Sequence, residues 1–598
     1  MTEQQFMPFF RENLSKGPSI SVFLGLLDKL GKVTELGEQA ALIDYIEQHL
    51  NKWPDDLRVV YGGHTVKQAS FRLVRTLVLK GKQLNWSARN SKERAAFFSE
   101  TKELRHLTAL QLHNDAIDEA GMIAIANSPH LVNLRVLEIS FSSIGEKGLE
   151  ALAHSPLMQQ LSTLKFVSCG LGVEAFKAFA RLAPVPQLQT LSLSANPLRD
   201  EGIHLLASLD CFTGLKQLDL HDTWFGDEGA EALSKADFIL SLTELDLGRN
   251  RFGIKGFKAL LSRPMKKLVK CGLKYAQLDA EAAGVLASAG QLTSLSSLDL
   301  SRNKLGTDGI KVLLQADFCS QLTELDMSDN QLGAEGAQAI ATTPQLAGLS
   351  VLKINDNDIR ATGAIALAES PYLVHLRELG LGDNWIGEEG LSAITNAPQM
   401  HALRVLDLGR NGFKVQDMKI LVASPYLKNL VSLELQSNEL GDEGIAELSS
   451  ATHFTELKYL GLYYNQISHR GMVSLAQAEW CQELTCLDLN KNELGSRGVR
   501  VLASSPYLKS LEELKLGYCE LGEEGLEKLV NSPIFQQLSS LEIDGNDITD
   551  SGILMLVEAV AHTRLHRLLL RGSLITEPGK KALRESPLLG GADLEHSL

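Results

Sequence analysis

The sequence predicts an α/β solenoid in which short parallel strands line a concave face and helices line the convex face. A segment of about 27 residues recurs along most of the 598-residue chain. Each copy contains a short alternating apolar segment, typical of a strand, followed by apolar residues at helical spacing. The chain is also too long for one compact core, which favours several domains or an extended array of repeats.

The repeat follows the pattern L-x-x-L-x-L-x-x-N-x-L, and its positions are counted from the first leucine. Eighteen copies share one phase, apart from one that is a residue short. They begin at Leu107, Leu134, Leu161, Leu188, Leu215, Leu242 and Leu268, and then at every 27th residue from Leu295 to Leu565. A less regular copy, VRTLVLKGKQL, begins at Val74, 33 residues before the first regular one.

Each repeat has two halves. In the first half, segments such as Leu245-Asp246-Leu247 alternate with period two and predict a strand with its leucines turned inward. In the second half, segments such as GDEGIAELSSA (441–451) predict a short helix with acidic residues in its first turn. Seven repeats then carry Ser-Pro, as at Ser424-Pro425, and the proline is expected to end the helix.

Position nine is the most polar of the regular positions. It is asparagine in eleven repeats: Asn196, Asn250, Asn303, Asn330, Asn357, Asn384, Asn411, Asn438, Asn465, Asn492 and Asn546. A buried amide can satisfy backbone groups that a tight turn leaves unpaired, so we expect a buried asparagine column with a structural role. Cys169 and Cys519 stand at the same position and are expected to be structural too.

This pattern resembles the leucine-rich repeat superfamily, and within it the long, helix-bearing class typified by ribonuclease inhibitor and the Ran GTPase-activating protein. The ending A-x-S-P-x-L, as in ALAHSPL (151–157), is most similar to cytoplasmic bacterial arrays of this class. The resemblance covers roughly residues 74–590 and implies a curved horseshoe or superhelix. It implies no particular function, because one scaffold hosts many.

The chain is expected to have four parts. Residues 1–68 lie outside the repeat and predict helices near 3–15, 20–31 and 37–52, which form either a helical cap on the solenoid or a docking domain. Residues 69–106 form an irregular first repeat, residues 107–590 the eighteen regular repeats, and residues 591–598 a frayed tail.

Composition excludes several classes of function. The net charge of -15 argues against a nucleic-acid binder, which needs an excess of Lys and Arg. We find no signal peptide and no apolar run long enough to span a membrane. The seven cysteines lack C-x-x-C spacing and favour reduced thiols in the cytoplasm over disulfides or a zinc site. No catalytic motif is present, so we expect neither an enzyme nor a cofactor or metal.

Three groups of outward-facing residues are candidates for binding a partner. The first is a tyrosine and lysine cluster near the C-terminal end, and the second is a central acidic group on three adjacent repeats. The third consists of two tryptophans directly after position nine. The cluster contains Tyr459, Tyr463, Tyr464, Lys491 and Tyr518; the acidic group contains Glu324, Asp326, Asp329, Asp356, Glu378 and Asp383; the tryptophans are Trp224 and Trp385.

Each group has a structural alternative. Aromatic side chains can simply pack on neighbouring lysine stems, and the tryptophans can pack locally. The acidic residues at position five can simply be typical of this repeat, with each carboxylate paired to a nearby basic side chain. Three arginines stand three residues after such a carboxylate: Arg249 after Asp246, Arg302 after Asp299 and Arg410 after Asp407. Exposed tyrosines edged by lysine have the composition of a protein interface, whereas stacked carboxylates favour a basic partner.

The leading hypothesis is a non-enzymatic, monomeric, cytoplasmic scaffold that binds a protein partner on its concave face. The alternative is a regulator of an enzyme, either a nuclease inhibitor or an activator of a small GTPase. Two features disfavour the alternative: cysteine is rare at position nine, and the strongly acidic C-terminal tail common among the GTPase activators is absent.

Overall fold

The computed structural model describes residues 3–15, 18–31, 33, 36–61, 72–80, 90–560, 563, 565 and 567–586. The chain divides into two compact units, one built mainly from residues 1–224 and the other mainly from residues 225–582. The expected tail at residues 591–598 lies outside the described residues, as do residues 81–89 of the irregular first repeat.

The first unit begins with three helices where the sequence predicts them: α1 (Glu3–Ser15), α2 (Ile20–Gly31) and α3 (Leu36–Leu50). The N-terminal segment is not wholly helical, however. Strand β1 (Val59–Tyr61) follows η1 (Asp55–Leu57) and pairs in parallel with β2 (Thr76–Lys80), the strand of the irregular repeat. That this segment acts as a cap or as a docking domain stays a prediction.

The strands confirm the repeat register. In the first unit β2 is followed by β3 (Ala109–His113), β4 (Val136–Ser140), β5 (Thr163–Val167), β6 (Thr190–Ser192) and β7 (Gln217–Asp219). In the second unit the strands are β8 (Glu244–Asp246), β9 (Lys270–Gly272), β10 (Ser297–Asp299), β11 (Glu324–Asp326), β12 (Val351–Lys353), β13 (Glu378–Gly380), β14 (Val405–Asp407), β15 (Ser432–Glu434), β16 (Tyr459–Gly461), β17 (Cys486–Asp488), β18 (Glu513–Lys515), β19 (Ser540–Glu542) and β20 (Arg567–Leu569). Neighbours pair in parallel within each unit, and Leu325 lies beside Leu352, 27 residues later. The short repeat appears as an offset of 26 residues between Leu245 and Cys271.

Helices follow the strands on the other side of each repeat. The first unit contains α5 (Ser91–Glu100), η3 (Lys102–His106), α6 (Glu119–Ala126), α7 (Gly145–Ala153), η4 (Pro156–Gln159), α8 (Val173–Phe176), η5 (Lys177–Arg181) and α9 (Arg199–Ala207). The second contains α10 (Asp227–Lys235), η6 (Asp237–Ser241), α11 (Ile254–Leu261), α12 (Ala280–Ala287), α13 (Gly306–Leu313), η7 (Asp317–Gln321), α14 (Gly333–Ala341), η8 (Pro344–Gly348), α15 (Arg360–Ala368), α16 (Gly387–Asn396), η9 (Pro398–Ala402), α17 (Val415–Val422), α18 (Gly441–Ser449), α19 (His469–Leu475), η10 (Glu479–Glu483), α20 (Gly495–Ala503), α21 (Gly522–Val530), α22 (Pro533–Gln537), α23 (Asp550–Val560) and α24 (Glu577–Glu585). None of the described helices is long and apolar enough to cross a membrane.

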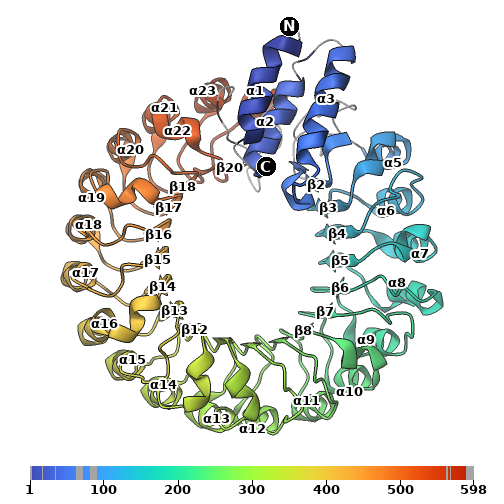
Figure 1. The fold of residues 1–598 in the computed structure, drawn as a ribbon, viewed down its shortest axis with the longest axis horizontal. Coiled ribbons are helices and arrows are strands. Elements are labelled where there is room, and N and C mark those ends of the chain that lie inside the picture. Colours follow the sequence, from blue (N-terminus) through green and yellow to red (C-terminus); the bar gives the residue numbers. More distant parts are fainter. Residues whose placement is uncertain are drawn as a thin grey trace. The chain divides into compact units, whose positions relative to one another are not determined.

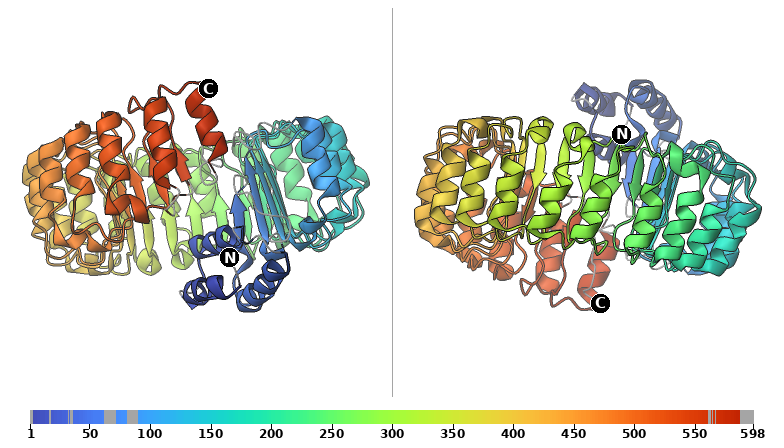
Figure 2. Two further views of the ribbon diagram at one scale, coloured as in Figure 1. Left: turned by 90° about the horizontal axis from the view of Figure 1, so that it is seen from above. Right: turned by 90° about the horizontal axis from the view of Figure 1, so that it is seen from below.

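Within the second unit the strands follow the inner side of an arc and the helices the outer side (Figure 1). Figure 2 shows these helices side by side along the outer side. Strands stack about 4.8 Å apart, whereas packed helices need about 8–10 Å, so the stack bends toward its strands. A small residue in the helix keeps that outer spacing short: a Cβ on Gly363 would lie only 3.0 Å from the Cβ of Ala337 in the preceding helix.

The core lies between the two layers. Positions four and six of the repeat turn inward as predicted; Leu325 and Met327, for example, are buried. The Ser-Pro segments end the helices as expected, but their serine also links repeats. The Ser424 hydroxyl donates to the carbonyl of Thr395 at 2.6 Å, 29 residues earlier, and accepts from the amides of Tyr426 and Leu427.

Candidate functional site

The backbone at position eight has one conformation throughout the regular repeats of the second unit. The residues there have φ between 53° and 67°: Arg249, Tyr275, Arg302, Asp329, Asp356, Asp383, Arg410, Ser437, Tyr464, Lys491, Tyr518, Gly545 and Gly572. This left-handed region favours glycine and costs roughly 1 kcal/mol for most other residues. Position eight is therefore a turn at the end of each strand, and most repeats place a side chain there at some cost.

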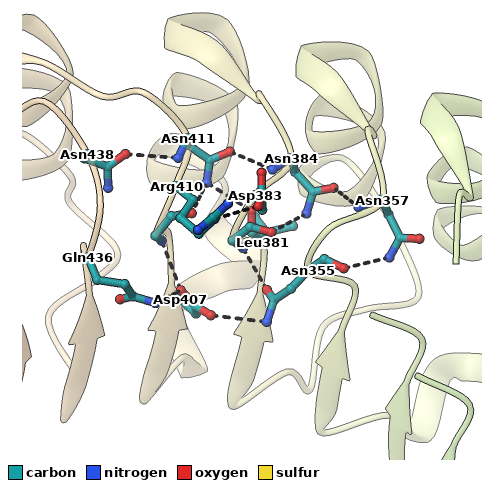
Figure 3. A network of polar contacts seen from close by, with 12 residues as sticks. Asn355, Asn357, Leu381, Asp383, Asn384, Asp407, Arg410, Asn411, Gln436 and Asn438 are labelled. Atoms are coloured by element: carbon teal, nitrogen blue, oxygen red, sulfur yellow. Dashed lines mark hydrogen bonds and ion pairs between the residues drawn. The ribbon is translucent and has the colours of Figure 1, made fainter. Parts of the chain in front are cut away.

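The asparagine column holds this turn in place. The Asn411 amide donates to the carbonyls of Leu408 and Gly409 in its own repeat and of Leu381 in the preceding one, at 3.0–3.2 Å (Figure 3). Its oxygen accepts from the amides of Asn384 and Ile386 at 3.2 and 3.3 Å. The column is buried, as predicted, and the side chains at position eight are left to face outward.

Cysteine replaces asparagine in this column as the sequence predicts. The thiol of Cys169 donates to the carbonyl of Ile139 at 3.3 Å, and that of Cys519 donates to the carbonyl of Leu489 at 3.1 Å. Both side chains are buried, and all seven cysteines are unpaired with one another. Burial raises the pKa of each of these two thiols to about 12, so neither is a reactive thiolate.

The tyrosine and lysine cluster lies on three consecutive repeats of the second unit. Tyr464 and Tyr518, both at position eight, are 58% and 55% exposed. Lys491 stands between them at position eight, with its Nζ 5.8 Å from the centre of the Tyr518 ring and 5.3 Å from that of Tyr463. The Tyr463 and Tyr464 rings lie 6.3 Å apart. Lys491 thus lies between the aromatic rings of the repeats before and after its own and connects them into one surface.

Tyr459 supports this surface from the side. It is half-buried, and its ring and the Glu434 carboxylate lie over Gly461, where an added Cβ would meet Glu434 Oε2. The pKa of Glu434 is raised to about 7, first by burial and then by the charges of Asp407 and Asp488, while a hydrogen bond from Tyr459 and the charge of Lys515 lower it in part. Tyr459 is therefore mainly a packing and hydrogen-bonding residue, unlike the exposed Tyr464 and Tyr518.

The central acidic group is partly neutralised from within. Glu378 pairs with Lys353 at 2.8 Å, and Asp383 pairs with Arg410 at 2.6 Å. Burial alone would lower the pKa of Lys353, but the hydrogen bond and charge of Glu378 raise it overall. Two other members of the group accept hydrogen bonds from serines: Glu324 accepts from the Ser297 hydroxyl and Asp326 from the amide of Ser328. The last two, Asp329 and Asp356, stand on adjacent repeats at position eight.

Asp356 is the most exposed carboxylate of the position-eight stack. Burial and then the charges of Asp329 and Asp383 raise its pKa, while Arg410 and Arg302 lower it in part. No ion pair joins Asp329 or Asp356 to another described side chain. The predicted accumulation of like charge is thus present, although it is smaller than six carboxylates suggest.

Arg410 does not pair as the structural alternative supposed. Arg410 binds Asp383 at position eight of the preceding repeat, and not Asp407 of its own repeat. Asp407 instead accepts from the amide of Gly409, and from Asn355 Nδ2 at 3.2 Å, two repeats earlier (Figure 3). Asn355 reaches that far because the intervening repeat has no side chain at Gly380 or Gly382.

The two tryptophans point outward, as expected. Trp224 is 53% and Trp385 65% exposed, whereas Phe225 and Ile386, which follow them, are buried. The Trp224 Nε1 group donates to Asp222 at 3.0 Å, so this indole is held locally. The two residues belong to different units and are treated as separate candidates.

A second aromatic and basic group, which was not predicted from the sequence, also lies at position eight. Tyr275 is 53% exposed, and the Arg249 guanidinium lies 5.7 Å from the centre of its ring. Arg302 follows on the next repeat, also exposed. Aligning position eight over all repeats would have found this group, because it has the same composition as the Tyr464 cluster.

Comparison with known proteins gives a family. A leucine-rich repeat family model matches eleven segments of the chain: residues 130–153, 214–234, 240–261, 291–314, 318–341, 349–368, 372–394, 426–449, 481–503, 507–530 and 536–557. A comparison with curated proteins gave no match.

The matches among solved structures have low identity and low TM-scores. An internalin from Listeria monocytogenes is 19% identical over 62% of this chain and 94% of its own, with a TM-score of 0.39. A TLR13–ssRNA13 complex is 18% identical over 85% of this chain and 62% of its own, with a TM-score of 0.30. A leucine-rich repeat protein from Leptospira interrogans is 23% identical over 79% of this chain and 92% of its own, with a TM-score of 0.28. With its in-phase repeats, its parallel strands backed by helices and its eleven matches to the family model, the chain belongs to the leucine-rich repeat superfamily.

Proposed function

We propose that this protein is a non-enzymatic scaffold that binds a protein partner on the strand side of its second unit. The surface formed by Tyr464, Lys491 and Tyr518, flanked by Tyr463, makes the central contact. The observation that carries the proposal is the contact of Lys491 with the rings of Tyr463 and Tyr518, beside two tyrosines, Tyr464 and Tyr518, that are 58% and 55% exposed. The left-handed backbone is shared by the regular repeats of this unit and is not specific to the two tyrosines.

The chemistry of this surface suits a protein. Tyrosines offer a wide, rigid contact area with a polar hydroxyl, and such residues are enriched at the energetic centres of interfaces. Lys491 lies against two of the rings and is itself exposed, so its charge stays available at the centre of the patch. Asp329 and Asp356, on the same face, favour a partner with a basic surface there.

Substitution by glycine tests this proposal most directly, because glycine fits the backbone conformation of position eight. The repeat after Tyr518 already has Gly545 at position eight, with φ of 60°. Tyr464→Gly and Tyr518→Gly therefore remove the aromatic rings without disturbing the turn. Tyr275→Gly is the matched control, since it removes an exposed tyrosine from the same backbone position on a different part of the same unit.

The assay is quantitative recovery of partners on the immobilised full chain, followed by affinity measurement for the recovered protein. We expect the Tyr464→Gly/Tyr518→Gly variant to bind at least about tenfold more weakly, as for hot-spot residues, and Tyr275→Gly to bind as the wild type does. Equal binding by wild type and the double variant would refute the proposal for this surface.

The identity of the partner tests the alternative function. Faster hydrolysis by a recovered small GTPase, or inhibition of a recovered nuclease, would make this protein a regulator of an enzyme. The cytoplasm remains the compartment we favour, because the seven cysteines are few and unpaired. Trp224 and Trp385 are secondary candidates, each testable by substitution with Gln in the same binding assay.

A further inference from the structure

A cleft in the first unit, on its helical side, points to a second site. It has a volume of about 830 Å³, within the usual range for ligand pockets, and lies between α8 and α9. Helix α8 is only four residues long and continues as the 3₁₀ helix η5, whereas α7 and α9 each have nine residues. The segment thus changes from α to 3₁₀ geometry at Lys177, which is one of the residues that line the cleft. Its walls are Val173, Glu174, Lys177, Pro197, Arg199, Glu201, His204 and Leu205.

Arg199 occupies a position of the repeat where glycine is usual. Ten other repeats have glycine at position twelve. In seven of them the glycine has φ between 58° and 66°: Gly145, Gly306, Gly333, Gly387, Gly441, Gly495 and Gly522. Arg199 has the same left-handed backbone, with φ of 56°. Its amide donates to the carbonyl of Thr223 at 3.0 Å, as the amide of Gly306 does to the carbonyl of Asn330. Arginine is thus placed where glycine fits at lower cost.

A second arginine at position twelve shows what such a residue does when it is structural. Arg360, with φ of 55°, binds the Asp358 carboxylate through Nε at 2.9 Å and through its terminal nitrogen at 3.0 Å. Asp358 stands two residues earlier, at position ten. The corresponding residue before Arg199 is Pro197, which has no carboxylate. Among the described side chains Arg199 has no ion pair.

The other charges of the cleft define its preference. Lys177 and Glu174 form an ion pair at 2.5 Å, so their charges cancel locally. Glu201 is exposed on the first turn of α9 and forms no ion pair with Arg199. Val173, Pro197 and Leu205 supply apolar wall. The cleft therefore combines an apolar surface with one guanidinium that has no carboxylate bound to it.

We propose that this cleft binds a ligand with an apolar body and a single anionic group, the anion meeting Arg199 and the apolar body lying against Val173, Pro197 and Leu205. A guanidinium matches the planar geometry of carboxylate, sulfonate and phosphate oxygens. This site is independent of the surface proposed above, because it belongs to the other unit and to the helical side.

The test uses two fluorescent probes that differ in charge. Anilinonaphthalene sulfonate has an apolar body with one anionic group, and phenylnaphthylamine is its neutral analogue. Both are titrated against the full-length wild type and against Arg199→Gly, Glu201→Gln and Arg360→Gly. Glycine restores the residue usual at position twelve, so Arg199→Gly and the control Arg360→Gly are expected to fold, which circular dichroism checks.

We expect saturable binding of the sulfonate to the wild type. Its affinity should fall at least about fivefold in Arg199→Gly, as for loss of a charged hydrogen bond, and stay unchanged in Arg360→Gly. Glu201→Gln should raise it about twofold by removing a repelling charge. The neutral probe should bind all four proteins alike. The proposal is overturned if the wild type shows no saturable binding, if Arg199→Gly or Glu201→Gln leaves the sulfonate affinity unchanged, or if Arg360→Gly weakens it equally.

Discussion

Replacing Asn411 by alanine should destabilise the second unit more than its small change in volume suggests. Asn411 is 5% exposed, and its side chain makes hydrogen bonds to three carbonyls and two amides, which belong to its own repeat and the preceding one. In the alanine variant the amides of Asn384 and Ile386 lose their acceptor inside the protein. Each buried group left unsatisfied costs about 1–3 kcal/mol, so we expect a loss of about 3 kcal/mol.

A cysteine in place of Asn411 separates the loss of the hydrogen-bond donor from the loss of the acceptor. Cys519 shows that a thiol at position nine still donates to the carbonyl of the preceding repeat. Because the thiol keeps a donor and sulfur is a weaker acceptor than the amide oxygen, Asn411→Cys should cost less than alanine, about 2 kcal/mol. Asn429→Ala is the control: Asn429 is only half-buried and donates to the His401 carbonyl, at 2.7 Å, and its loss should cost less than about 1 kcal/mol.

Two measurements check this prediction. Urea unfolding followed by circular dichroism gives the change in free energy, and hydrogen exchange gives the protection of individual amides. Because repeat arrays lose strict two-state behaviour, exchange at the amides of residues 384 and 386 is the more direct measurement. A loss below about 1 kcal/mol in Asn411→Ala, with unchanged protection at these two amides, would refute the role assigned to the column.

Three further predictions concern stability. The pKa of Glu434 is raised to about 7 in the folded protein from an ordinary value of 4.5, so its contribution to stability is fully present below about pH 4.5 and is lost as the pH rises through 7. Glu434→Gln should remove this loss, which is on the order of 1–2 kcal/mol after allowance for solvent screening. Urea unfolding at pH 5 and pH 8 measures the decrease in the free energy of unfolding between the two pH values, and an equal decrease in the wild type and the variant would refute the reasoning. Ser424→Ala should cost about 1–2 kcal/mol in the same assay, because the hydroxyl joins two repeats, whereas the exposed Ser450→Ala should have little effect. Cys519→Asn should raise stability by about 1 kcal/mol by adding an acceptor to the column, and a drop in the urea midpoint would show that the site is too small for the amide.

The sequence predicted the scaffold well because burial is encoded within each repeat. Inward leucines, the asparagine column and the prolines after the helices depend on residues a few positions apart, and all of them appear in the structure. Strand β1 was missed because it lies outside the repeat and is only three residues long. Its pairing with β2 could not be inferred from a pattern with no second copy.

The candidate site was predicted less completely, because its contacts join different repeats. The outward direction of Tyr464 and Tyr518 was predicted because the leucines of the repeat fill the interior, but the left-handed turn that holds the two tyrosines was not predicted. The choice of Asp383 as the partner of Arg410 depends on that turn, which directs the arginine to the preceding repeat.

The sequence by itself determined the repeat, its register and the set of side chains that leave the core. Only the tertiary structure decided which of those side chains neutralise each other and which stay available. Tyr459 proved to be supporting, Arg360 to be paired and Arg199 to face a cleft, although Arg360 and Arg199 share one repeat position. The physical reason is that hydrophobic burial is periodic and local, whereas charge pairing depends on what adjacent repeats present within a few ångströms.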